Sequence, residues 1–259
     1  MGESNIKVLR DAMSQAGGGG RRVSLPGGIL HEGKRYKDVT LRELTGADEE
    51  ILCGSFVNGA QQVTALLARA IAGVEGCPAP VDIGMTENML VGDRDYLLLR
   101  LRQIEVGDLV HEVVRCRNTA CAHKVDVEFL ISEIPVRKVD ELAATLETSL
   151  VDEQSKTQRA RLRFPTGADL DAIAEFLPGN PGAANTRLYA RVLDKLEGQS
   201  ATDEETVRRL PLRLRAQLAT FIANNAPGPD LAVDIACPHC GTDMSYSFDL
   251  NAFFLPSVS

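Results

Sequence analysis

The sequence of 259 residues predicts an α+β fold built from two tandem copies of one helical unit, each with a β-hairpin and a zinc-knuckle hairpin. The first observation behind this prediction is repetition, because Leu44-Thr45-Gly46-Ala47-Asp48 returns as Pro165-Thr166-Gly167-Ala168-Asp169, 121 positions later. The second is that Cys116 and Cys237 stand at the same offset, and each is soon followed by another cysteine. Equivalent cysteine turns in a duplicated chain predict two copies that pack about a pseudo-twofold axis and share one four-cysteine zinc site.

Composition places the chain among ordinary soluble globular proteins. Apolar residues make up 44% and charged residues 25%, which is enough to form a sizeable core. Asp and Glu outnumber Lys and Arg by 36 to 28, whereas a protein that binds nucleic acid needs a cationic surface. No stretch approaches the ~20 apolar residues of a membrane span, and no secretory signal begins the chain. The sequence therefore predicts a cytoplasmic protein with no nucleic-acid partner and no membrane span.

Residues 1–22 lie outside the repeat. Ile6, Leu9 and Met13 share one helical face, and the glycines at 17–20 form a flexible tether. So short a helix is unstable alone in water. The segment is expected to be a flexible N-terminal arm, either a disordered tail or one that folds onto a partner.

The predicted repeats span residues 23–135 and 146–259, joined by a linker at 136–145. Each repeat is expected to begin with a β-hairpin, and the predicted strands are 22–25 with 38–44 and 146–151 with 159–164. Thr45 and Thr166 are then expected to cap a helix, with the Asp three residues later facing the positive end of its dipole.

Two further helices are predicted in each repeat. The second helix is expected over 61–75 and 185–197, ended in each case by a glycine, Gly76 or Gly198. The third is expected over 93–104 and 212–224. In its first copy Leu97, Leu98 and Leu101 recur at helical spacing, which predicts core packing.

Each repeat is predicted to close with a cysteine turn between two strands. Apolar and polar residues alternate over 125–129 and 244–248, the period of a half-buried strand. Cys237-Pro238-His239-Cys240 has the spacing of a zinc knuckle, and Cys116 with Cys121 forms a wider version. Gly241 suits the tight turn, and since Ala122 replaces it in the first loop, that loop is expected to turn differently.

The four thiolates of Cys116, Cys121, Cys237 and Cys240 are the predicted metal ligands. A closed four-sulfur zinc site leaves no position for water or substrate, so it contributes folding energy rather than catalysis. Alternatives are free buried thiols, a disulfide, a site that has lost its metal, or His123 or His239 in place of one sulfur. Cys53 is expected to be a small buried residue, and Cys77 has no assigned role.

No catalytic arrangement is predicted. His31 and His111 have no Ser, Cys or carboxylate at a spacing that specifies one. Phosphate-binding glycine loops, dinucleotide fingerprints and metalloprotease helices are also absent from the sequence. Residues 232–259 contain no Lys or Arg, which disfavours a nucleic-acid-binding zinc ribbon. Phe253-Phe254-Leu255 is expected either to close the core or to form an apolar contact patch.

The order of several motifs over residues 23–256 resembles the myovirus-type baseplate protein family of phage contractile tails and phage-derived contractile injection systems. The segments that carry the resemblance are 44–50, 91–102 and 237–240, followed by 248–250 and 253–254. The resemblance implies a structural, non-enzymatic component of a baseplate, incorporated into a tail-like particle beside other baseplate, tube, spike or tape-measure proteins. Alternatives are a transient tail-assembly chaperone or adaptor, and a zinc-ribbon regulator that binds nucleic acid.

Overall fold

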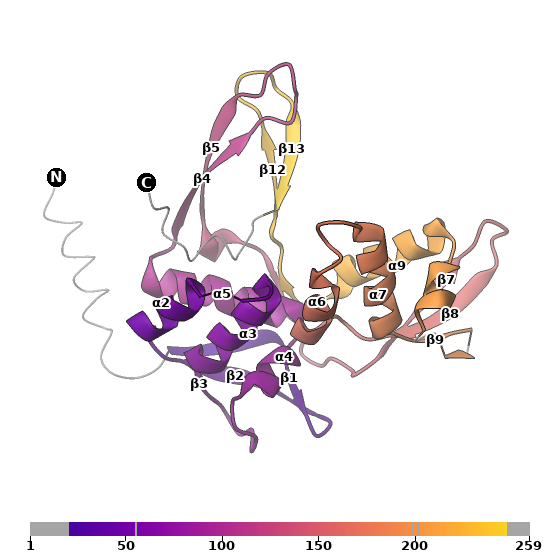
Figure 1. Cartoon of the computed structure of the whole chain (residues 1–259), viewed down its shortest axis with the longest axis horizontal. Helices are drawn as coiled ribbons and strands as arrows, with labels where there is room; N and C mark the ends of the chain where they lie inside the picture. Colours follow the sequence, from indigo (N-terminus) through magenta and orange to yellow (C-terminus); the bar gives the residue numbers. More distant parts are fainter. Residues whose placement is uncertain (1–20, 55, 198, 201–202, 248–259) are drawn as a thin grey trace, which may run out of the picture.

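The computed structural model describes residues 21–54, 56–197, 199–200 and 203–247. Most of the expected N-terminal arm, Gly198 and the Phe253-Phe254-Leu255 segment lie outside these residues. Arg21, which was expected in the arm, belongs to the first strand together with Arg22. The chain forms two helical units side by side, with two long β-hairpins that rise together from them (Figure 1).

The first unit begins with a three-stranded antiparallel sheet of order β1-β2-β3. Its strands are β1 (Arg21–His31), β2 (Lys34–Leu41) and β3 (Ile71–Val74). Its helices are α2 (Gly46–Leu52), α3 (Gly59–Ala70), α4 (Ile83–Glu87) and α5 (Val91–Glu105).

The second unit has a four-stranded sheet of order β10-β9-β8-β7. Its strands are β7 (Leu146–Val151), β8 (Thr157–Leu162), β9 (Leu193–Leu196) and β10 (Gln199–Ser200). Its helices are α6 (Gly167–Ala174), α7 (Pro181–Val192), α8 (Glu204–Arg208) and α9 (Leu212–Asn225). Apart from β10, the order of elements matches that of the first unit.

Two β-hairpins follow the helical units in the chain. One consists of β4 (Leu109–Arg115) and β5 (Lys124–Leu130), the other of β12 (Ala232–Ala236) and β13 (Asp243–Ser247). After β5 the chain forms a short 3₁₀ helix, Ile131–Glu133, and then β6 (Val136–Arg137). β6 pairs with β11 (Gly228–Pro229), so the end of the first unit is joined to the second.

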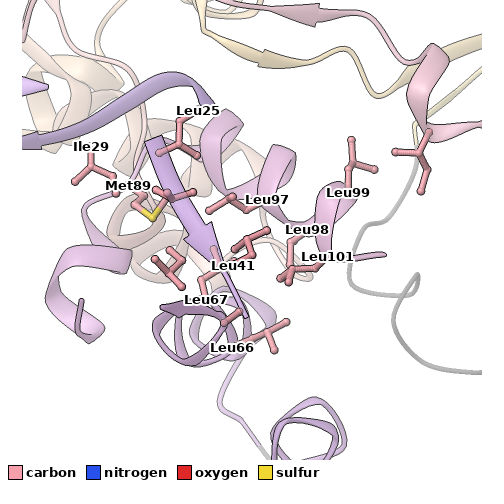
Figure 2. Close-up of a cluster of buried hydrophobic side chains, with 14 of the residues drawn as sticks. Leu25, Ile29, Leu41, Leu66, Leu67, Met89, Leu97, Leu98, Leu99 and Leu101 are labelled. Atoms are coloured by element: carbon pink, nitrogen blue, oxygen red, sulfur yellow. The ribbon is translucent and has the colours of Figure 1, made fainter. Parts of the chain in front are cut away.

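The largest hydrophobic core lies in the first unit. Side chains from its sheet and from α3 and α5 converge there, among them Leu25, Leu41, Leu67 and Leu97 (Figure 2). The predicted leucine stripe is confirmed, because Leu97, Leu98 and Leu101 are all at most 3% exposed. The second unit has a separate core around Leu150, Leu162, Leu193 and Leu218.

The prediction for the second helix of each repeat is wrong at its C-terminal end. α3 ends at Ala70, and the chain continues as β3 instead of remaining helical to residue 75. Ile71 takes up an extended conformation and pairs with Leu41 of β2, which buries its side chain to 3% exposure. α7 likewise ends at Val192, before β9. In both units the last turn of the expected helix forms an additional sheet strand, because pairing satisfies its backbone groups.

Each of the helices that begin after Thr45 and Thr166 has a buried carboxylate at its N-terminus. Asp48 is 0% exposed and accepts hydrogen bonds from the backbone N–H and hydroxyl of Thr45 at 2.8 and 2.9 Å. Arg42 donates two more, at 2.7 and 2.8 Å, and Arg69 donates one at 2.7 Å. These hydrogen bonds, that of Arg42 foremost, hold the pKa of the Asp48 carboxyl well below its usual value despite burial.

The second unit repeats this arrangement. Asp169 is also 0% exposed, and it accepts from Thr166, Arg163 and Arg191 through the equivalent atoms. Burial opposes ionisation, but the hydrogen bonds of Arg163 lower the pKa of Asp169. The predicted capping box is confirmed at Thr166, and α2 likewise begins directly after Thr45, with Asp48 at the predicted place. The two arginines that bind each carboxylate are additional to the prediction. The carboxylate with its threonine and two arginines is called the carboxylate clamp below.

The two helical units contact each other through different surfaces. The Val91 N–H donates to the Pro165 carbonyl at 3.0 Å, and the Gly167 N–H donates to the Met89 carbonyl at 3.1 Å. The Asn58 amide donates to Asp171 at 2.6 Å. The equivalent residues of the opposite units make no such hydrogen bonds within the described residues. The contact between the helical units is therefore head-to-tail and does not follow the expected pseudo-twofold axis.

Candidate metal centre

The cysteine turns lie at the tips of the two hairpins, as Figure 1 shows at the top of the molecule. Cys116 directly follows β4 and its N–H donates to the His123 carbonyl at 2.8 Å, while the Cys237 N–H donates to the Thr242 carbonyl at 2.9 Å. Ala122 (φ 45°) and Gly241 (φ 70°) both take the left-handed conformation. The loops differ in length, but the expectation that Ala122 makes the first one turn differently is wrong at this residue.

The turns bring four sulfur atoms together. The Sγ atoms of Cys116, Cys121, Cys237 and Cys240 all lie within 4.8 Å of one another. Cys116 and Cys240 are separated by 3.6 Å, and Cys121 and Cys237 by 3.9 Å. With Zn–S bonds of about 2.3 Å, a tetrahedral centre requires sulfurs about 3.8 Å apart. The four thiols therefore have the chemistry and the spacing of a tetrahedral metal centre.

The sulfur pairs are arranged as a local twofold axis would place them. Cys116 is equivalent to Cys237 and Cys121 to Cys240, so exchanging the two hairpins converts one close sulfur pair into the other. The two sulfur distances agree with such an axis at the cysteine turns, whereas the helical units beneath them meet head-to-tail.

The four sulfurs differ in how far they are buried, and Cys116 and Cys237 form the inner, buried pair. Cys116 and Cys237 are 5% and 1% exposed, whereas Cys240 is exposed. A small apolar cluster supports the inner pair, formed by Val114, Val125, Val127 and Met244. Phe129 and Ile235 pack against the same cluster, so the hairpins associate through the sulfurs and through a small apolar contact.

The acidities of the thiols also differ. Burial raises the pKa of the Cys116 thiol to about 12, whereas the neighbouring Thr242 hydroxyl, 3.2 Å from Cys240 Sγ, lowers the pKa of Cys240 to about 6. Four thiolates this close repel one another, so a bound cation is needed for all of them to ionise. Thr242 was not among the residues predicted for the site. Its sequence signal is its position two residues after Cys240.

The other candidates from the sequence do not join this set. His123 and His239 pack against each other, with ring centroids 4.8 Å apart, and the converging ligand atoms are all sulfurs. Cys53 was expected to be buried on the first helix, but it is exposed and lies just after α2, which ends at Leu52. Cys77 is half-buried, and it lies far from both cysteine turns in the sequence. His111 lies on a strand surface, 3.5 Å from Asp126.

A cavity of about 760 Å³ lies between the helical units. Its described lining is mostly apolar and contains no serine, threonine, cysteine, histidine or lysine, and Asp95, Arg137 and Asp230 supply its charged groups. Burial raises the pKa of Asp95 to about 7, and Arg137 donates to the carbonyls of Ala223 and Ala226. The lining thus offers no nucleophile paired with a base.

Within the part of the chain that the structure describes, no helix combines the length and the apolar character needed to cross a bilayer.

The model of the family described as T4 bacteriophage base plate protein matches residues 30–255. The match spans both helical units and both cysteine turns. Comparisons with curated proteins and with solved structures gave no significant match.

Proposed function

The chain belongs to the T4 bacteriophage base plate protein family, and on this premise we propose that it is a structural, non-enzymatic component of the baseplate of a contractile tail-like particle. The observation that carries the proposal is a family match extending over nearly the whole chain, across both units. The particle is either a phage tail or a contractile injection system. Its neighbours are other baseplate, tube, spike or tape-measure proteins.

In this proposal Cys116, Cys121, Cys237 and Cys240 hold one structural zinc ion. Support comes from the donor set, because four thiolates favour zinc and the sulfur spacing suits a tetrahedron. With all four positions filled by sulfur, the ion contributes folding energy and fixes the two hairpins to each other.

We further propose that the chain arose by tandem duplication, with an N-terminal arm at 1–22, repeats at 23–135 and 146–259, and a linker at 136–145. The shared order of elements supports this, as does the carboxylate clamp, which recurs with the same five hydrogen-bonding groups at Asp48 and Asp169. Two linked rigid units joined by a metal-bound hairpin pair suit a building block for an assembly.

Fractionation of particles from the native host tests the baseplate role. Tagged full-length chain is expected in finished particles and in isolated baseplates, together with tube and sheath proteins. Cys53→Ser, which changes an exposed thiol outside the sulfur set, serves as a control and is expected to co-fractionate normally. Recovery only with incomplete assemblies would instead identify a chaperone or adaptor, and absence from both fractions would refute the baseplate role.

A further inference from the structure

The contact between the helical units uses one surface from each, and both surfaces exist twice in the chain. The helix-start surface is Thr166–Asp171 in the second unit and Thr45–Glu50 in the first. The arginine surface is formed by Asn58, Met89–Val91 and Arg94 in the first unit, and by Asn180, Leu210–Leu212 and Arg215 in the second. Only the second-unit helix start and the first-unit arginine surface meet within the chain.

In the engaged pair the helix start packs directly on an arginine. The Arg94 guanidinium donates to the Thr64 hydroxyl at 2.9 Å and to the carbonyls of Thr86 and Ala60 at 2.7 and 2.8 Å. Gly167 lies against it so closely that a Cβ there would be 2.0 Å from Arg94 Nη1. Glycine is therefore required at 167 by the neighbouring unit, and Arg94 is left 2% exposed.

The arginine surface of the second unit is built in the same way and is uncovered. Arg215 donates to the Thr186 hydroxyl at 2.9 Å and to the carbonyls of Val207 and Gly182 at 3.5 and 3.3 Å, the equivalents of the Arg94 partners. Arg215 is only half-buried, however, and Leu212, the equivalent of Val91, is 83% exposed.

The helix-start surface of the first unit is equally uncovered. Thr45, Gly46 and Ala47 are all exposed, although Gly167, the twin of Gly46, is buried. No atom lies within 4 Å of the place where a Cβ at Gly46 would stand, and Gly46 has no positive φ. Neither the space around it nor its backbone conformation within this chain therefore explains why residue 46 is glycine.

The free surfaces also carry complementary backbone and charged groups. The engaged contact joins the N–H groups of Val91 and Gly167 to two carbonyls. The equivalent groups are the N–H groups of Leu212 and Gly46 and the carbonyls of Leu44 and Leu210, and they have no hydrogen-bond partner among the described residues. Glu49 and Glu50 are exposed at the free helix start. In the sequence, Leu210–Leu212 is flanked by Arg208, Arg209 and Arg213, which are all exposed. Glu175, Glu204 and Glu205 form ion pairs with Arg187, Arg208 and Arg209, so that with Arg213 and Arg215 this region keeps an excess of positive charge.

We propose that a second copy of this chain docks its free helix-start surface on the free arginine surface, repeating between molecules the contact that joins the two units within one. Gly46 would then lie on Arg215 of its neighbour, as Gly167 lies on Arg94. The two free surfaces belong to α2 and to α7–α9, at opposite ends of the pair of units in Figure 1. Such a head-to-tail contact produces rings or filaments rather than closed dimers.

Sedimentation of the purified full chain over about 1 to 300 μM tests this self-association. The weight-average mass of the wild type is expected to rise at least twofold with concentration. Gly46→Leu fills the space that Arg215 would occupy and is expected to remain monomeric. Gly73→Leu is the matched control, since Gly73 also has open space around it but lies on β3, and it is expected to associate like the wild type.

A mixing experiment identifies the two surfaces. Gly46→Leu blocks one surface and Leu212→Asp blocks the other, so each variant alone is expected to be monomeric and their mixture to form one-to-one pairs only. Gly46 and Leu212 are the exposed first residues of α2 and α9, so neither change disturbs a core. An Asp at the first position of α9 is also favourable for the helix dipole. Glu50→Arg, which brings a cation to the arginine surface, is expected to weaken association of the otherwise unaltered chain at least tenfold.

A wild type that stays monomeric at about 300 μM would overturn the proposal. So would association of either single variant, or a mixture that remains monomeric. The test uses isolated protein, so its outcome is independent of the baseplate role.

Discussion

The two helical units form their helix starts from the same residues, but only one of these starts is covered. Asp48 and Asp169 are clamped by equivalent threonines and arginines with nearly equal distances. Gly167 is nevertheless buried against Arg94, whereas Gly46 is exposed. The comparison teaches that the local sequence determines the conformation of the helix start, and the neighbouring unit determines whether it is buried.

The cores of the units differ at one equivalent position. The first unit places the carboxylate of Asp93 where the second has Leu214, and both side chains are at most 1% exposed. Asp93 accepts a hydrogen bond from the Gly27 N–H at 2.7 Å, and its second oxygen is buried without a hydrogen-bond partner in the described part of the chain. The first unit therefore carries a polar group whose burial is unfavourable, and the second unit does not.

Removal of the metal is expected to destabilise the two hairpins, while the helical units stay folded. Structural zinc contributes about 10–16 kcal/mol of binding free energy in small zinc-dependent folds, and besides the sulfurs the hairpins share one small apolar cluster. Chelation should abolish amide-exchange protection in β4, β5, β12 and β13, while α5 and β2 remain protected. Native protein should contain about one zinc per chain.

Cys53→Ser should retain the ion, and Cys116→Ser should lose it. Metal-free native protein with protected hairpins would contradict the zinc assignment.

Breaking either carboxylate clamp is expected to have the next largest effect. Asp48→Asn or Asp169→Asn leaves two arginines without their counter-charge, which should lower the free energy of unfolding by about 3–4 kcal/mol, measured in urea. The lowered pKa of Asp48 means that its contribution is present above pH 3.8 and is lost as the pH falls further. The two variants should show similar losses, and a loss confined to one unit would show that the clamps are not equivalent.

Asp93→Asn is expected to change the pH dependence of stability. Burial raises the pKa of Asp93 from 3.8 to about 6, so the folded state binds more protons than the unfolded state between these values. This group therefore makes wild-type stability fall as the pH rises through that window, by about 3 kcal/mol in total. Unfolding curves of wild type and variant should diverge by this amount between about pH 4 and about pH 7.5. Leu214→Val in the other core should shift stability equally at both pH values.

The smallest expected effect separates the two glycines. Gly167→Ala places a Cβ against Arg94 and should destabilise the chain by about 2 kcal/mol. Gly46→Ala has open space and no positive φ, so monomeric protein should be unchanged or stabilised by up to about 1 kcal/mol. Thermal unfolding of dilute protein measures both. Equal effects would mean that the contact between the units is not as close as described.

Local signals made much of the fold predictable. The caps at Thr45 and Thr166, the leucine stripe of α5 and the cysteine turns all follow from spacing within short segments, and the structure contains each of them. β3 was missed because Ile71–Val74 continues an apolar helical run, and Gly73 alone did not mark the end of the helix. Only its partner Leu41, far away in the chain, makes it a strand.

Contacts between units were not predictable from spacing. Arg94 looks like a surface residue of a helix, and its burial depends on Gly167, Thr64 and Thr86, which no local pattern connects. The equivalence of the repeats suggested a twofold arrangement of the whole chain. The helical units meet head-to-tail instead, and residue spacing does not determine this because it depends on which surfaces pack best.

The position of the sulfur cluster has a topological consequence. Cys121 and Cys237 are 116 residues apart, and the whole second helical unit lies between them. An ion bound to both would close this stretch into a loop before or during folding. Cross-links around loops of about 100 residues reduce the entropy of the unfolded chain by the equivalent of 4–5 kcal/mol. The metal site would thus stabilise the second unit although its four cysteines contact none of that unit's core residues.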